Sequence, residues 1–127
     1  MRYLIINMLF VCMLFSEKLS NDVRWVVNSK EYEALGHQVY NQAKKDLTNI
    51  WIRGKAVVMD LDETVLDNSQ YQIELHEKNE TFNMQSWAAW DEREEAKLVP
   101  GVYDYISFLR ANKVQIIFIS NRMHERL

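Results

Sequence analysis

The chain has 127 residues, of which 18 are acidic and 15 are basic, so its formal net charge is −3. This length is typical of one domain, and a hydrophobic content of 48% is sufficient for a packed core. The charge balance argues against the clustered basic surface of a protein that binds polymeric nucleic acid, but it is compatible with a small ligand such as a mononucleotide.

The first 20 residues differ in character from the rest. Arg2 precedes an apolar run over residues 3–15 that only Asn7 interrupts, and polar residues follow. This pattern is typical of a secretory signal peptide, because a membrane-spanning helix needs about 20 apolar residues. We therefore predict a removable leader over residues 1–20 and an exported protein that is periplasmic, secreted or associated with the outer membrane.

Cys12, the single cysteine of the chain, lies within this apolar run. It is a candidate for lipid attachment and hence for membrane anchoring. Bacterial lipoproteins place a small residue before that cysteine, whereas Val11 stands here. An ordinary apolar cysteine in a discarded segment is therefore the favoured interpretation, and the mature domain would hold no disulfide.

Residues 29–47 predict the first long helix. Asn28 and Glu31 fit a capping pair at its start. Apolar side chains recur at helical spacing, and they are Tyr32, Leu35, Val39, Ala43 and Leu47, with Tyr40 widening the buried face. These aromatic residues are expected to belong to the core rather than to a ligand site.

Two continuous apolar runs follow, at residues 56–59 and 114–120. The segment over residues 100–112 between them has a helical apolar stripe. Continuous apolarity is typical of strands that are buried on both faces of a parallel sheet. We therefore predict an α/β fold in which a right-handed crossover makes the two strands parallel.

Acidic residues crowd the end of the first predicted strand, at Asp60, Asp62, Glu63 and Asp67. A single Asp there would mean little, because turns often contain one. The carboxyl ends of parallel strands, however, share the sheet edge at which open α/β folds bind ligands, so Asp60, Asp62 and Ser120 are expected to meet there. Alternation along an extended segment places Asp60 and Asp62 on the same side.

Two neighbouring carboxylates suit divided roles in phosphoryl transfer. One can attack phosphorus as a nucleophile while the other donates a proton to the leaving group and later activates water. Because a carboxylate and a phosphate dianion repel each other, a cation is expected at the site, and oxygen ligands favour Mg²⁺.

Several stretches resemble a known family. DLDET (residues 60–64) fits the DxDxT signature of the haloacid dehalogenase superfamily of phosphotransferases, and FISNR (residues 118–122) resembles its second motif. Three longer stretches are similar to parts of the class C acid phosphatases, which are exported bacterial phosphomonoesterases. They are SKEYEALGHQVYNQAKK, VVMDLDETVLDNS and SWAAWDEREEAKLVPGV. The similarity runs from about residue 25 to the last residue.

The resemblance implies a Rossmann-like parallel sheet with a small helical cap inserted at about residues 69–99. It implies that Asp60 is the nucleophile that forms an aspartyl-phosphate and that Asp62 is the general acid and base. Mg²⁺ would be held by the Asp60 carboxylate and the Asp62 backbone carbonyl, and Ser120 would donate a hydrogen bond to a phosphoryl oxygen. The expected substrate-binding residues are Ser120, Asn121, Arg122 and Thr64.

Some of these assignments have alternatives. Arg122 could instead be a solvated arginine, and Thr64 could be a simple turn or helix-cap hydroxyl. Asp67 and Asn68 are expected to shape the following turn.

The predicted insertion is rich in aromatic residues, namely Tyr71, Phe82, Trp87 and Trp90. Trp87 and Trp90 share a helix face, which most often means packing onto the main domain. An aromatic platform for a nucleobase or an aryl leaving group is the alternative, because the family acts on nucleoside monophosphates and aryl phosphates.

The family pattern continues with a lysine and a further acidic loop that do not follow here. We therefore expect a magnesium-dependent acid phosphatase acting on small phosphomonoesters, of which these residues form the N-terminal part, and we expect the 127-residue chain itself to be poorly active or inactive. The alternatives are a non-catalytic binding or storage relative and another phosphotransferase of the superfamily. Retention of Asp60 and Asp62 argues against the first, and the leader and tryptophan-rich insertion argue against a cytosolic mutase.

Overall fold

The computed structural model describes residues 18–122. Most of the predicted leader, including Cys12, therefore lies outside the described residues. Within the described part, no helix combines the length and apolarity needed to cross a membrane. The elements in chain order are α2 (Asn21–Asn28), α3 (Lys30–Thr48), β1 (Ala56–Asp60), β2 (Leu66–Asp67), α4 (Ser69–Glu77), α5 (Met84–Arg93), β3 (Lys97–Leu98), α6 (Val102–Ala111) and β4 (Gln115–Ile119).

The long helix α3 begins one residue later than predicted. Its N-cap is Ser29, whose hydroxyl accepts a hydrogen bond of 2.9 Å from the backbone N–H of Tyr32. The predicted capping pair of Asn28 and Glu31 is therefore wrong, because Asn28 is the last residue of α2. The serine side chain is short enough to reach the free N–H groups of the first turn, so it takes over the cap.

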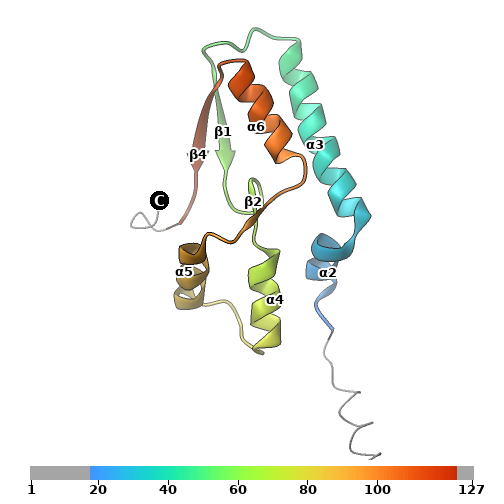
Figure 1. Cartoon of the computed structure of the whole chain (residues 1–127), viewed down its shortest axis with the longest axis vertical. Helices are drawn as coiled ribbons and strands as arrows, with labels where there is room; N and C mark the ends of the chain where they lie inside the picture. The colour runs from blue at the N-terminus through green and yellow to red at the C-terminus, as the bar shows by residue number, and fades with distance from the viewer. Residues whose placement is uncertain (1–17, 123–127) are drawn as a thin grey trace, which may run out of the picture.

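The predicted strand, helix, strand unit is confirmed as β1, α6 and β4. β1 and β4 pair in parallel, with Ala56 opposite Gln115 and Asp60 opposite Ile119. Both strands point towards α4 and α5, and α3 and α6 lie side by side along them (Figure 1). The carboxyl ends of both strands thus share one edge of the sheet, as predicted.

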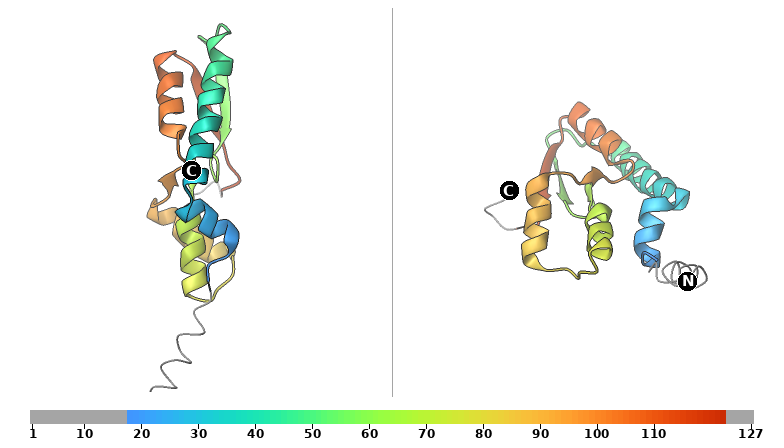
Figure 2. Two further views of the ribbon diagram at one scale, coloured as in Figure 1. Left: turned by 90° about the vertical axis from the view of Figure 1, so that its right-hand side faces the viewer. Right: turned by 60° about the horizontal axis from the view of Figure 1, so that its bottom comes forward.

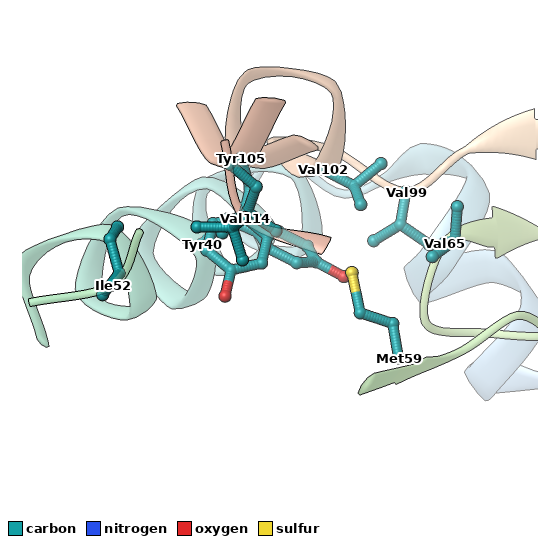
Figure 3. Packing of buried hydrophobic residues seen from close by; sticks show 9 residues of the cluster. Tyr40, Ile52, Met59, Val65, Val99, Val102, Tyr105 and Val114 are labelled. Carbon is teal, nitrogen blue, oxygen red and sulfur yellow. The ribbon is translucent and has the colours of Figure 1, made fainter. Parts of the chain in front are cut away.

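The main core lies between the sheet and the pair of helices α3 and α6. Val102 and Leu109 of α6 have no exposed surface, and Met59 of β1 reaches towards the ring of Tyr40 from α3 (Figure 3). The buried members of the cluster are Tyr40, Ile52, Met59, Val65, Val99, Val102, Tyr105, Leu109 and Val114. The helical stripe predicted from residues 100–112 is therefore the face that α6 buries.

The prediction that both strands are buried on both faces is wrong for the described part of the chain. Val57 and Met59 face the core, whereas Val58 is 58% exposed. Ile117 and Ile119 of β4 are 38% and 60% exposed. One physical reason is that α3 and α6 cover the same face of the sheet, so strand alternation leaves Val58, Ile117 and Ile119 on the other face. Phe118, near the end of β4, is also 45% exposed.

Two glycines allow α3 to approach the turn before α6. A Cβ atom on Gly36 would lie 2.6 Å from the carbonyl oxygen of Pro100, and one on Gly101 would lie 3.0 Å from the Cα of His37. Gly101 also has a φ of +86°, which disfavours residues with a side chain. The close packing of α3 on this turn therefore depends on the absence of both side chains.

We expect Gly36→Ala to lower the free energy of unfolding by about 1 to 2 kcal/mol, because overpacking against Pro100 outweighs the gain in helix propensity of up to about 1 kcal/mol. Urea unfolding measures the difference. The control is Gln38→Ala, which replaces an exposed residue of the same helix and is expected to change stability little. A Gly36→Ala variant that is more stable than wild type would contradict the proposed contact.

The segment over residues 69–99 forms a small insertion with its own apolar cluster. α4 and α5 lie beyond the carboxyl end of the sheet, away from the α3 and α6 pair (Figure 2, right). Trp90, Tyr71 and Leu75 are buried together, with Trp87 packed against them. The predicted packing of the two tryptophans onto the main domain is confirmed only in part, because both rings pack against Tyr71 of α4 while Trp90 also bonds to Asn68 and Trp87 lies beside Arg122. The short β2 and β3 pair antiparallel and connect the insertion to the core.

Candidate functional site

The carboxyl edge of the sheet brings together the residues of the two sequence motifs. Asp60 ends β1 and is exposed, and in the parallel register it stands opposite Ile119. Ser120 follows directly and is partly buried. Its hydroxyl accepts a hydrogen bond of 3.1 Å from the backbone N–H of Arg122. The predicted convergence of Asp60 and Ser120 is therefore a consequence of strand pairing.

The chain turns immediately after Asp60. The carbonyl oxygen of Leu61 accepts hydrogen bonds from the backbone N–H groups of Val65 at 2.8 Å and Leu66 at 2.9 Å, and Glu63 has a φ of +59°. The prediction that the chain stays extended through Asp62 is therefore wrong. The turn exposes Asp60 and directs Asp62 into contacts with other elements.

Tyr40 fastens this turn to α3. Its hydroxyl donates a hydrogen bond to the backbone carbonyl of Thr64, while its ring packs in the core beside Tyr105. The core position predicted for Tyr40 is confirmed, and the hydroxyl adds a contact that steadies the turn. This contact uses the backbone of Thr64, and the role of its hydroxyl stays a prediction.

Arg122 joins the turn to the insertion. Its Nε donates to both carboxylate oxygens of Asp62, at 3.2 and 3.0 Å, and its Nη2 donates to Oδ1 of the same group. On the other side, Nη1 lies 2.8 Å from Oδ1 of Asp91 in α5. The side chains of Arg122, Asp62 and Asp91 are 11%, 18% and 4% exposed. The alternative of a solvated arginine is therefore wrong.

Asn68 contacts Asp62 from a second direction. Its Nδ2 donates to Oδ1 of Asp62 at 2.9 Å and to Oε1 of Glu63 at 3.2 Å. Its Oδ1 accepts a hydrogen bond of 2.8 Å from the indole N–H of Trp90. Asn68 is only 1% exposed. Besides shaping the turn, as the sequence predicts, it therefore links Asp62 to Trp90.

These contacts set the charge of the acidic residues. Burial raises the pKa of Asp62, but hydrogen bonds from Arg122 and Asn68, the charge of Arg122 and the Ser120 hydroxyl together hold that pKa below its ordinary value. Burial is also the main reason that the pKa of Glu63 is raised, although Asn68 opposes it. Asp62 is therefore ionised and fixed at neutral pH.

The aromatic residues of the insertion divide into buried and accessible ones. Tyr71 is 3% exposed and its hydroxyl lies 2.8 Å from Oγ of Ser86, so it offers no face to a ligand. Phe82 is 56% exposed, and Trp87 is partly buried, with its ring centroid 5.6 Å from the guanidinium carbon of Arg122. An aromatic platform can therefore include Phe82 and Trp87 but not Tyr71.

Sequence reasoning found the motif residues but missed their partners. Asn68 and Asp91 belong to the site because they contact Asp62 and Arg122, and Trp90 belongs to it because it donates a hydrogen bond to Asn68. The sequence held one usable signal, which was a run of polar and aromatic residues in an insertion next to the motif. Asn121 is exposed at the end of the described chain, and its predicted contact with substrate stays a prediction.

The residues of the site supply oxygen atoms for a cation, but few of them. Among residues 18–122, no group of three or more His, Cys, Asp or Glu side chains could hold a metal ion. Two protein oxygens, from the Asp60 carboxylate and the Asp62 backbone carbonyl, are compatible with Mg²⁺, which usually keeps several of its water ligands. Both are oxygen donors of the kind that Mg²⁺ prefers.

Comparisons with known proteins agree with this geometry. The sequence pattern of the family described as HAD superfamily, subfamily IIIB (acid phosphatase) matches residues 6–127. The class C acid phosphatase of Bacillus anthracis is similar in structure, with 32% identity and a TM-score of 0.76. A second structure of that enzyme, with tungstate bound, gives 34% identity and a TM-score of 0.72.

Each match covers 82% of this chain and 45% of the solved one, so the chain spans less than half the length of these relatives. The matched region includes both motifs, and the family pattern extends over nearly the whole chain. The chain therefore belongs to the acid phosphatases of subfamily IIIB of the haloacid dehalogenase superfamily.

Proposed function

We propose that this chain carries the phosphoryl-transfer residues of a magnesium-dependent acid phosphatase that hydrolyses small phosphomonoesters. The observation that supports it most is the pairing of an exposed Asp60 at the end of β1 with a fixed Asp62 two residues later. One carboxylate is accessible to substrate, and the other is held by donors. An accessible carboxylate suits a nucleophile, and a carboxylate that hydrogen-bond donors hold in place suits a group that must be positioned for proton transfer.

The reaction has two steps. A carboxylate oxygen of Asp60 attacks phosphorus, the phosphorus–oxygen bond of the ester breaks, and Asp62 gives its proton to the departing alcohol oxygen. Water then attacks the aspartyl-phosphate while Asp62 takes a proton from it, which releases phosphate and restores Asp60. The Ser120 hydroxyl, at the end of β4, would donate a hydrogen bond to a phosphoryl oxygen.

Acid conditions suit the first step. Because Arg122 and Asn68 hold the pKa of Asp62 below its ordinary value, the carboxyl carries the proton that it must donate only when the pH is low. We therefore expect turnover to increase as the pH falls from neutral into the acid range. Mg²⁺, held by the Asp60 carboxylate and the Asp62 carbonyl, would neutralise the repulsion between carboxylate and phosphate.

Aryl phosphates and nucleoside monophosphates are the proposed substrates. Exposed Phe82 and partly buried Trp87 lie on the insertion, and Trp87 is next to the Arg122 guanidinium. The Bacillus anthracis relative has been solved with tungstate, an oxyanion that resembles phosphate in shape. We also propose export, for which residues 1–20 of the sequence are the support.

The first test is release of p-nitrophenol from p-nitrophenyl phosphate by the chain, with Mg²⁺ or with a chelator, between pH 4 and 8. We expect slow, magnesium-dependent turnover, below the usual enzyme range of about 1 to 10³ s⁻¹, because the described residues supply few metal ligands. Turnover within that range would contradict the expected weak activity of this chain. A complete lack of turnover would leave this chain with a binding role.

A further inference from the structure

Asn68 is a buried polar residue whose side chain lies between the insertion and the turn over residues 61–66, here called the motif turn. Both of its functional atoms are used, since Nδ2 donates to Asp62 and Glu63 and Oδ1 accepts from Trp90. A buried amide with these partners is costly to misplace, because rotating it would leave polar groups without hydrogen bonds. Its position is therefore determined by its neighbours.

Trp90 determines which way the Asn68 amide points. An indole N–H can only donate, so the atom of Asn68 that faces it at 2.8 Å must be the oxygen. The NH₂ group must then point the other way, towards the carboxylate of Asp62 at 2.9 Å. Without the indole donor, the Asn68 oxygen would lose this partner and only the carboxylates of Asp62 and Glu63 would hold the amide in its orientation.

The indole itself is held firmly. Trp90 is 3% exposed, and its ring packs beside Tyr71 with 6.1 Å between ring centroids. Arg93 covers the ring, with its guanidinium carbon 4.7 Å from the centroid. α5 also reaches the same carboxylate by a second route, because Asp91 pairs with Arg122 and Arg122 pairs with Asp62.

We propose that Asn68 is a positioning residue for Asp62 and that Trp90 of the insertion orients it, so that helix α5 sets the placement of the acid and base group. The inference rests on the proposed function for the role of Asp62, but the chain of hydrogen bonds can be tested without turnover. A change in α5 would then alter the chemistry of the site without touching substrate.

The experiment is nuclear magnetic resonance of the whole chain at a fixed pH of 7.5. The chain is labelled with ¹³C aspartate and ¹⁵N, and the Asp62 carboxyl resonance is the one that disappears in Asp62→Asn. We expect Trp90→Phe, which keeps a ring but removes the N–H, to shift the Asp62 resonance and to speed hydrogen exchange of the Asn68 side-chain NH₂. In the reverse direction, Asp62→Asn is expected to shift the indole resonance of Trp90.

Tyr71→Phe is the matched control, because it removes a buried hydrogen bond to Ser86 within the same aromatic cluster but keeps the ring beside Trp90 and the side-chain hydrogen bonds from Trp90 to Asn68 and from Asn68 to Asp62. It is expected to leave the Asp62 resonance in place. Asn68→Asp separates the two halves of the link, since its ionised carboxylate can still accept from Trp90 but cannot donate to Asp62. It is expected to move the Asp62 resonance while the Trp90 indole keeps its slow exchange.

Equal shifts of the Asp62 resonance in Trp90→Phe and Tyr71→Phe, or none in Trp90→Phe, would overturn the inference. If Trp90→Phe loses the dispersed spectrum of a folded chain, Asn68→Asp and Asp62→Asn decide the question through the Trp90 indole. Where turnover is measured, kcat is expected to fall about tenfold in Trp90→Phe with KM little changed. Lack of turnover in the wild-type chain bears on the proposed function only, because the resonance comparison does not depend on it.

Discussion

Replacement of Arg122 by leucine is expected to lower the free energy of unfolding at pH 7 by about 2 to 4 kcal/mol. Arg122 is the cation between two mostly buried carboxylates, Asp62 and Asp91, so its removal leaves two negative charges facing a site with less water than bulk solvent. The substitution also removes the guanidinium N–H groups that join the motif turn to α5. Urea unfolding followed by far-ultraviolet circular dichroism measures the loss.

The pH dependence of this loss has a definite sign. The pKa of Asp62 in the folded chain lies below the ordinary value of 3.8, so its ionised form contributes stability above that value and the contribution disappears as the pH falls through the folded pKa. The difference between wild type and Arg122→Leu is therefore expected to be full at pH 7 and to shrink in strong acid. A difference that stays constant or grows as the pH falls would show that the lost stability has another cause.

Arg93→Leu is the matched control. Arg93 also makes a forked contact with one carboxylate, at 3.0 and 2.6 Å to Glu74, and it also lies over a tryptophan ring. Its side chain is 38% exposed, however, so water screens the pair and the expected loss is much smaller. Arg122→Lys keeps the positive charge but loses the paired guanidinium donors. Its free energy of unfolding is expected to lie between those of wild type and Arg122→Leu.

The second large effect is expected at the nucleophile. Asp60→Asn should reduce phosphatase turnover by about 10³-fold or more, because an amide cannot form the aspartyl-phosphate. The exposed position of Asp60 at the end of β1 predicts that the fold is unaffected. The measurement is turnover of p-nitrophenyl phosphate together with mass spectrometry of the protein after acid quenching.

Asp62→Asn provides the contrast, because it blocks proton transfer but not attack. General acid and base catalysis contributes about 10²- to 10⁴-fold to a rate. Because p-nitrophenol leaves readily without a proton, hydrolysis of the aspartyl-phosphate is the step that should be slowed most. The variant is expected to accumulate a phosphate adduct, and the double variant Asp60→Asn with Asp62→Asn should show none. An adduct on the Asp60→Asn chain would assign the nucleophile to another residue.

Much of the fold was predictable because its signals are local. Continuous apolar runs predicted β1 and β4, and helical stripes predicted α3 and α6. The stripe of α6 is the face that it buries, whereas Leu35 and Val39 of the α3 stripe are 45% and 53% exposed. The convergence of Asp60 and Ser120 also followed, because parallel pairing places both strand ends at one edge. The prediction that both faces of the sheet are buried was wrong, because no local sequence pattern indicates on which face of a sheet two helices will pack.

The sequence by itself determined the chemical groups of the site and the family to which the chain belongs, since the acidic motif directly follows a strand. Only the tertiary structure decided which groups Asp62 touches. Arg122 is 60 residues from Asp62, and Trp90 is 22 residues from Asn68, so both contacts depend on how separate elements are placed. Hydrogen bonds and ion pairs act over about 3 Å, and no periodicity in a sequence records which distant side chains will come that close.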